Sequence, residues 1–277
     1  MTLLQRIKWM AIILPSLAVI LYVLLLAGLW AMQDRLMYGR ASKEVKETPA
    51  ARGWQSEEVW CDVGGEKTHG WWIPVPEARG AVLFSHGSGR NISGYLEDAA
   101  LYREQGLSVL LYDYGGYGSS SGKASEPRCY ADARAMWSYL TETQGVPPEK
   151  IILAGSSMGG GVTVELATHV TPAAVILEST FTSVPDVLSD TYPFIPADWI
   201  CHIQFRNKDK IQHITRPLLL FHSREDTVVP FAHGRQLYEK APGPKTFVEI
   251  QGAHHGGKFT SRDLYSESLK KFIGEYF

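Results

Sequence analysis

The sequence predicts one α/β domain, built on a doubly wound and mostly parallel sheet, that follows a single hydrophobic helix. Two observations indicate this class. Beyond residue 54, short apolar runs alternate with longer helical stretches, and near-continuous apolar character is typical of strands buried on both faces. Residues 9–32 carry no charge at all. The predicted parallel strands are residues 81–85, 107–112, 151–154, 173–177, 218–222 and 246–250.

Composition narrows the class of protein further. The chain has 277 residues, 45% of them hydrophobic, which is enough for one large core. A net charge of −2 offers no basic field, so we expect no nucleic-acid partner. Three widely spaced cysteines, Cys61, Cys129 and Cys201, indicate packed thiols and neither a disulfide framework nor a zinc site.

The N-terminal segment 9–32 is long enough to cross the ~30 Å hydrocarbon core of a membrane as a helix. Trp9 and Trp30 lie at its two ends, where interfacial aromatic residues belong. A cleaved signal peptide is disfavoured, because the apolar stretch is long and the small-residue cleavage pattern is poor. We therefore expect a retained single-pass membrane anchor, with a tail at 1–8 and a linker at 33–53.

The orientation of this anchor stays open on the sequence alone. More basic residues follow the span than precede it, which favours a cytoplasmic catalytic domain. A short basic tail ahead of a span more often stays inside the cell, which favours export. The two criteria point in opposite directions.

After the linker, residues 54–277 form the predicted domain. Residues 56–63 and 68–75 flank Gly64-Gly65, a pattern typical of an antiparallel hairpin. The helix candidates are residues 127–140, 231–240 and 261–272. Residues 181–214, rich in proline and aromatic residues, interrupt the alternation. They form either an irregular surface connection or a small lid (cap) insertion over the site.

The stretch "LAGSSMGGG" at residues 153–161 holds the strongest chemical signal. It places Ser157 between Gly155 and Gly159 at a strand–turn–helix junction, the G-x-S-x-G pattern of a nucleophile elbow. The neighbours two positions away must be small, because the turn is tight. A serine that merely caps the helix is the alternative. Ser156 lacks glycines at both flanking positions and is a weaker candidate.

A serine nucleophile needs a base and an acid, expected later in the chain in the order acid, then histidine. Asp226, which follows a predicted strand, is the preferred acid, with Glu225 and Glu178 as rivals. His254, in the loop after the last strand, is the preferred base, with His255 as its rival. The histidines show no metal-binding spacing, so we expect no metal and no cofactor.

The oxyanion of the tetrahedral intermediate needs two backbone donors. The amide of Met158, directly after the nucleophile, is one candidate. The amide of Ser88 is the other, because it lies in the loop after the first central strand. Gly87 lets this backbone approach closely, and His86 is expected to fix the loop.

Taken together, these motifs resemble the α/β-hydrolase superfamily, and in particular its single-span, membrane-anchored serine hydrolases and the serine aminopeptidase-like group. The resemblance implies an α/β-hydrolase fold with Ser157, Asp226 and His254 as the catalytic triad. Two departures lie beside the site: Gly115 replaces a common arginine, and His255-Gly256 replaces Asn-Asp. The motifs that carry the resemblance are "HGSGRN", "YDYGGYGSSSG", "GSSMGG", "LESTFTS", "HSREDTVVP" and "GAHH".

The resemblance implies a membrane-tethered serine hydrolase that cleaves ester or thioester bonds of a small-molecule or lipid-like substrate. A serine peptidase or aminopeptidase on the same fold is the alternative enzyme. A non-catalytic scaffold that retains the fold is the alternative outside catalysis. The oligomeric state stays open.

Overall fold

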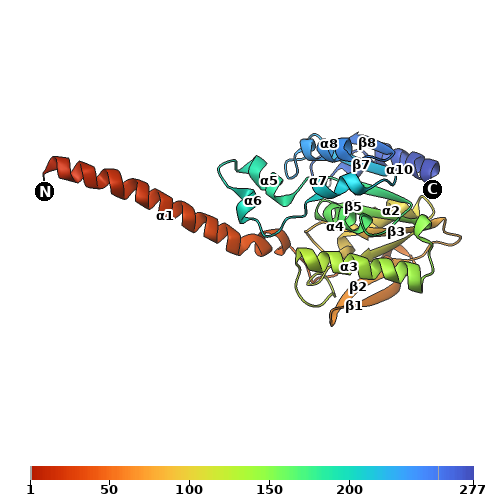
Figure 1. The fold of residues 1–277 in the computed structure, drawn as a ribbon. Coiled ribbons are helices and arrows are strands. Elements are labelled where there is room, and N and C mark those ends of the chain that lie inside the picture. Colours follow the sequence, from red (N-terminus) through yellow and green to blue (C-terminus); the bar gives the residue numbers. More distant parts are fainter. Residues whose placement is uncertain (1, 255) are drawn as a thin grey trace.

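A computed structural model describes residues 2–254 and 256–277 of the chain. A long helix, α1 (Leu3–Tyr38), extends away from a rounded α/β domain and places the N-terminus at its far end (Figure 1). At 1.5 Å per residue, its 36 residues make a rod of about 54 Å. In the described part of the chain, this is the one helix whose length and composition suit a membrane span.

One eight-stranded sheet forms the centre of the domain, in the order β1-β2-β4-β3-β5-β6-β7-β8. The first hairpin pairs antiparallel, β2 pairs antiparallel with β4, and the remaining pairs are parallel. The predicted fold class is therefore confirmed. The strands are β1 (Glu57–Val63), β2 (Glu66–Ile73), β3 (Gly80–Ser85), β4 (Leu107–Tyr112), β5 (Ile151–Ser156), β6 (Ala174–Glu178), β7 (Leu218–Ser223) and β8 (Lys245–Ile250).

Helices cover both faces of the sheet, as the apolar character of its strands requires. One buried cluster joins the sheet to α3, α4 and α8, and the other joins it to α2 and α10. The α-helices after α1 are α2 (Leu96–Arg103), α3 (Glu126–Ser138), α4 (Met158–Ala167), α5 (Val184–Thr191), α6 (Ala197–Ile200), α7 (Asn207–Lys210), α8 (Phe231–Lys240), α9 (Gly257–Thr260) and α10 (Arg262–Tyr276). Short helical turns of other types are Pro49–Arg52, Ile92–Tyr95, Tyr139–Thr143, Pro148–Lys150 and Ile211–His213.

The N-terminal helix is longer than the sequence predicted. Residues 33–38, assigned above to a linker, belong to α1, and Tyr38 at its end is buried in the core of the domain. Helix-favouring residues and packing against the domain continue the helix past its apolar part. The linker that remains is also tied down, because Ala41 forms a parallel β-bridge with Arg90.

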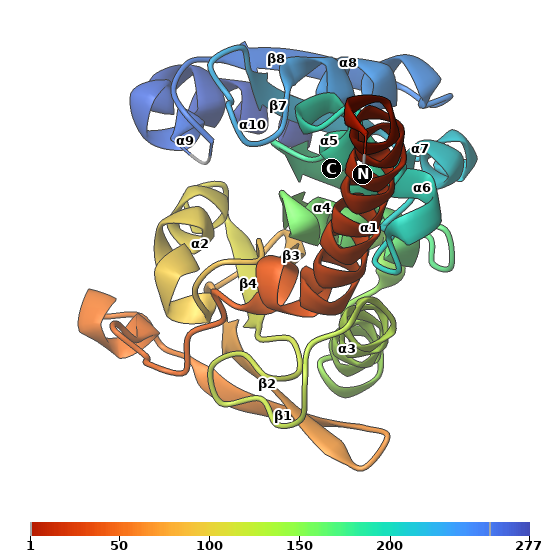
Figure 2. The same ribbon diagram turned by 90° about the vertical axis from the view of Figure 1, so that its left-hand side faces the viewer.

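The insertion at 181–214, which contains α5 to α7, contacts α1 (Figure 2). The Tyr22 hydroxyl donates to the carbonyl oxygen of Phe194 over 2.6 Å. Gln33 donates to the carbonyl of Ile200 over 2.7 Å and accepts from the amide of His202 over 2.9 Å. These contacts hold the insertion beside α1. Its role as a lid over the site stays a prediction.

Candidate active site

Ser157 stands on a sharp turn between β5 and α4. Its backbone has φ 54° and ψ −118°, a conformation that is strained for a residue with a side chain. A Cβ on Gly155 would lie 2.4 Å from the carbonyl oxygen of Gly159, and one on Gly159 would lie 1.9 Å from that of Ser85. Both glycines are thus required sterically, as the motif predicts, because backbone atoms fill the space on either side of the serine.

The structure brings His254 and Asp226 to this serine. The Nε2 atom of His254 lies 3.2 Å from the Oγ of Ser157, and its Nδ1 atom lies 2.6 Å from Oδ2 of Asp226. Asp226 Oδ1 accepts hydrogen bonds from the amides of Val228 (2.9 Å) and Val229 (2.8 Å). Because both oxygens of the carboxylate are held, the aspartate can fix the imidazole with Nδ1 protonated and Nε2 free to accept from the serine.

Electrostatics favour the charged form of Asp226. Burial alone would raise the pKa of this carboxyl group. The hydrogen bond and charge of His254 and the two backbone amides outweigh burial, and the pKa of Asp226 lies below its ordinary value. The carboxylate is therefore ionised at neutral pH.

The rival residues make other contacts. Glu225 accepts from the amide of Gly252 over 3.0 Å, so it supports the loop that carries the histidine. Glu178 accepts from the hydroxyl of Tyr265 over 3.1 Å, within the core. His255, the rival base, lies outside the described residues.

The two predicted oxyanion donors lie on different segments, Met158 directly after Ser157 and Ser88 in the loop after β3. Met158 is the first residue of α4, and the first amides of a helix have no acceptor within it. The carbonyl of Gly87 accepts from Nδ1 of His86 over 2.7 Å. Because the carbonyl and amide of a trans peptide point in opposite directions, this bond turns the Ser88 amide away from His86. His86 thus fixes the loop through the Gly87–Ser88 peptide.

Buried polar groups hold this loop in place. Burial lowers the pKa of His86, so its ring is neutral and donates from Nδ1. The hydroxyl of Tyr114 donates to the carbonyl of His86 (2.8 Å), and that of Tyr117 donates to the carbonyl of Ser88 (2.9 Å). Asp113 accepts from the amide of Ile92 over 2.9 Å.

A cavity of about 530 Å³ opens at the serine, a volume suited to a small-molecule substrate. Ser88, Ser157 and His254 line it, together with residues that the sequence analysis did not select. Arg40 and Arg90 are the most conspicuous of these. These two arginines are 50 positions apart in the chain, and no local sequence pattern predicts that they line one cavity.

Two further contacts support the backbone of Ser157. The Thr180 hydroxyl donates to the carbonyl of Ser157 over 2.8 Å, and the amide of Ser157 donates to the carbonyl of Glu178 over 2.9 Å. These bonds hold the strained turn from both sides. Among the described residues, no group of three or more His, Cys, Asp or Glu side chains could hold a metal ion.

Comparison with known proteins identifies the family. Residues 76–203 match the family described as serine aminopeptidase, S33. The chain is 38% identical over 204 residues to alpha/beta hydrolase domain-containing protein 17B of Xenopus laevis, covering 72% of this chain and 68% of that protein. The protein of the same name from Homo sapiens is 37% identical over 204 residues, with the same coverage.

Solved structures of low sequence identity share the fold. An esterase of Pyrococcus furiosus superimposes with a TM-score of 0.72 at 18% identity, covering 86% of this chain and 99% of that one. An alpha-beta hydrolase of Vibrio vulnificus superimposes with a TM-score of 0.73 at 22% identity, covering 88% and 92%. From its sequence relatives and its eight-stranded sheet, the chain belongs to the α/β-hydrolase superfamily.

Proposed function

We propose that this hydrolase is a membrane-anchored serine hydrolase that cleaves ester or thioester bonds through an acyl-enzyme intermediate. The observation that carries the proposal is the continuous path from Ser157 Oγ through His254 to Asp226, with contacts of 3.2 and 2.6 Å. A hydroxyl becomes a useful nucleophile only when a base removes its proton, and this path supplies both the base and the group that orients it.

In the first half of the reaction, Ser157 Oγ bonds to the substrate carbonyl carbon while its proton moves to His254 Nε2. The carbonyl π-electron pair moves to oxygen, where the amides of Met158 and Ser88 would stabilise it. The bond to the leaving group then breaks, and His254 returns the proton to the departing alcohol or thiol.

In the second half, His254 removes a proton from water as the water oxygen attacks the acyl carbon. The ester bond to Ser157 breaks, its oxygen regains the proton, and the carboxylic acid leaves. The sum is one ester or thioester and one water giving one acid and one alcohol or thiol. Asp226 stays ionised throughout and stabilises the imidazolium that forms twice.

Membrane anchoring rests on α1 and on the insertion beside it. The 18-residue apolar window of α1 is 0% buried by the rest of the chain. In the adjoining insertion the side chain of Trp199 is 91% exposed and that of Phe194 is 62% exposed. Large apolar side chains in this position suit a membrane interface, and they favour a lipid-like acyl substrate. Retention of the full chain in the membrane fraction after alkaline carbonate washing tests the anchor, and release into the wash would contradict it.

A fluorophosphonate probe tests the nucleophile directly. We expect the probe to label the wild-type full chain in membranes and the Ser156→Ala variant, and to leave Ser157→Ala unlabelled. Labelling of Ser157→Ala would reject the proposed nucleophile. Absence of labelling in the folded wild type would favour the non-catalytic scaffold.

The match to the serine aminopeptidase family keeps a peptidase as the second candidate function. A panel of p-nitrophenyl esters, acyl thioesters and aminoacyl p-nitroanilides separates the two. We expect turnover of esters or thioesters to exceed that of the anilides. A clear preference for aminoacyl anilides would instead establish the peptidase.

A further inference from the structure

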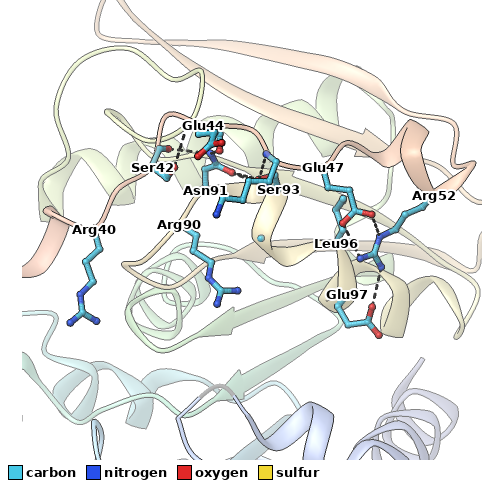
Figure 3. Close-up of a pocket in the computed structure, with 12 residues that line it drawn as sticks. Arg40, Ser42, Glu44, Glu47, Arg52, Arg90, Asn91, Ser93, Leu96 and Glu97 are labelled. Carbon is cyan, nitrogen blue, oxygen red and sulfur yellow. Dashed lines mark hydrogen bonds and ion pairs between the residues drawn. The ribbon is translucent and has the colours of Figure 1, made fainter.

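Two arginines stand where the catalytic cavity meets a second cavity. Arg40, Arg90 and Gly94 line both the cavity of about 530 Å³ at Ser157 and a neighbouring one of about 460 Å³. Figure 3 shows the side chains of Arg40 and Arg90 extending in the same direction, away from the polar contacts of Ser42 and Asn91. A substrate held at Ser157 would therefore have guanidinium groups at the boundary of its binding space.

Among the residues that the structure describes, neither guanidinium has a carboxylate partner. In the structure of residues 2–254 and 256–277, no hydrogen bond or ion pair involves the side chain of Arg40 or of Arg90. Arg52, in the wall of the second cavity, is the contrast, because it bonds Glu47 (2.9 Å) and Glu97 (3.0 Å) (Figure 3). Glu47 and Glu97 thus pair with Arg52, whereas Arg40 and Arg90 are available to a ligand.

Backbone contacts place the two arginines together from distant parts of the chain. The amide of Arg90 donates to the carbonyl of Arg40 over 3.2 Å, next to the β-bridge between Ala41 and Arg90. Arg90 adopts φ 68°, which is uncommon for a residue with a side chain. A Cβ on Gly94 would lie 2.8 Å from Cδ of Arg90, so the missing side chain makes room for the arginine stem. The position of Arg90 is thus held by its surroundings.

The catalytic cavity has a positive lining. Besides the arginines it contains Lys258, and none of its lining residues is aspartate or glutamate in the described part of the chain. Lys258 is already paired with the buried Asp98. The excess positive charge therefore comes from Arg40 and Arg90, and it favours a substrate with a compact anionic group.

We propose that Arg40 and Arg90 bind a phosphate group carried by the substrate, so that the enzyme prefers acyl esters of phosphate-bearing alcohols over their uncharged counterparts. Each guanidinium group presents paired N–H donors, and two such groups suit the several oxygens of a phosphate. The phosphate belongs either to a lipid headgroup or to a soluble phosphate ester. Arg40 follows the end of α1 by two residues, so the proposed site lies close to the surface of the membrane that α1 would cross. This assignment of substrate class rests on the proposed function.

Matched substrates test the assignment on the full chain in detergent or vesicles. The soluble pair is hexanoylglycerol 3-phosphate and monohexanoylglycerol, and the membrane pair is oleoyl lysophosphatidic acid and monooleoylglycerol in phosphatidylcholine vesicles. The members of each pair differ only by the phosphate. We expect the phosphate member of at least one pair to have the higher kcat/KM, and that pair identifies the source.

The arginines are tested by the ratio of kcat/KM for the phosphate member to that for the uncharged member. We expect Arg40→Gln and Arg90→Gln each to lower this ratio about tenfold, mainly through KM, as for loss of a charge-assisted contact. Arg216→Gln removes an exposed positive charge outside both cavities and should keep the wild-type ratio. Equal rates for both members in wild type, or an unchanged ratio in both arginine variants, would overturn the proposal.

A binding measurement separates this proposal from the proposed function. Calorimetric titration of the Ser157→Ala variant with hexanoylglycerol 3-phosphate should show binding that weakens about tenfold when Arg90→Gln is added. Such binding, with no turnover of any ester or thioester of the panel by wild type, would refute the hydrolase and support the phosphate site. Turnover of uncharged esters with no arginine-dependent binding would support the hydrolase and refute the site.

Discussion

The Nε2 atom of His254 lies 3.2 Å from the Oγ of Ser157, although the two residues are 97 positions apart in the chain. Ser157 follows a central strand of the sheet and His254 follows the edge strand β8. Both strands are parallel, so both ends open at the same edge of the sheet. β6 and β7 lie between these two strands, and Asp226, which follows β7, completes the contact at 2.6 Å.

Replacement of the serine should reveal the strain in its turn. Ser157→Gly is expected to be at least as stable as Ser157→Ala, because glycine adopts φ 54° without the penalty of about 1–3 kcal/mol paid by other residues. Both variants should lose ester hydrolysis. Thermal unfolding of the two proteins, compared in one detergent, checks the order of stability. A glycine variant that melts well below the alanine variant would contradict strain at this position.

The packing around the turn makes Gly159 intolerant of any side chain. Gly159→Ala should destabilise the fold by about 3 kcal/mol or more, because its Cβ would overlap the carbonyl oxygen of Ser85 at 1.9 Å. Gly274→Ala is the matched control, since its Cβ would meet nothing within 4 Å in helix α10. That control should gain about 0.5–1 kcal/mol from helix propensity. Denaturant unfolding of both variants measures the difference, and equal effects would refute the steric argument.

Loss of the aspartate charge should reduce turnover while the fold remains. Asp226→Asn is expected to lower kcat by about 10³–10⁴-fold, because an amide neither fixes the imidazole tautomer nor stabilises the imidazolium. Ester hydrolysis measured at saturating substrate checks this. A decrease of less than about tenfold would show that Asp226 does not act on His254.

The lowered pKa of Asp226 also predicts a pH dependence of stability. A carboxyl group with a lowered pKa in the folded state stabilises that state above its ordinary pKa of about 3.9, and the contribution is lost as pH falls through the folded-state value. The gap in melting temperature between wild type and Asp226→Asn should therefore shrink below about pH 4. A gap that widens toward acid would contradict a lowered pKa of Asp226 in the folded state.

His86 should produce its own acid sensitivity. Burial lowers its pKa, so the unfolded chain takes up a proton near pH 6.5 and the folded chain does so only at lower pH. The stabilising contribution is full above about pH 6.5 and is lost as pH falls through the folded-state pKa, at up to about 1.4 kcal/mol per pH unit. Between about pH 7.5 and 5.5, the melting temperature of His86→Asn should change less with pH than that of wild type.

The same position tests the oxyanion loop. The side-chain amide of His86→Asn can still donate to the carbonyl of Gly87, whereas His86→Ala cannot. We expect kcat of the alanine variant to fall about tenfold or more below that of the asparagine variant, because the Ser88 amide loses its orientation. Equal kcat values would show that His86 does not position this donor.

Local patterns in the sequence were enough to find the strands and the serine. Short apolar runs predicted each parallel strand within a few residues, because runs of four to six residues closed by small or polar residues are too short for a helix. The elbow was equally local, since the steric demands of the turn act on positions 155 and 159 themselves. Helix α1 (Leu3–Tyr38) extends beyond the predicted span 9–32 at both ends. At its C-terminal end it contacts the insertion and the core, and no neighbouring residue in the chain encodes those contacts.

The sequence by itself determined the fold class, the anchor-like helix and the list of acid and base candidates. Tertiary structure alone decided that Asp226, rather than Glu225 or Glu178, meets His254, and that Arg40 and Arg90 share one cavity wall. The physical reason is the same in both cases. Secondary structure follows from interactions between residues close in the chain, whereas these contacts join segments whose proximity depends on strand order and on the pairing of a loop with the linker.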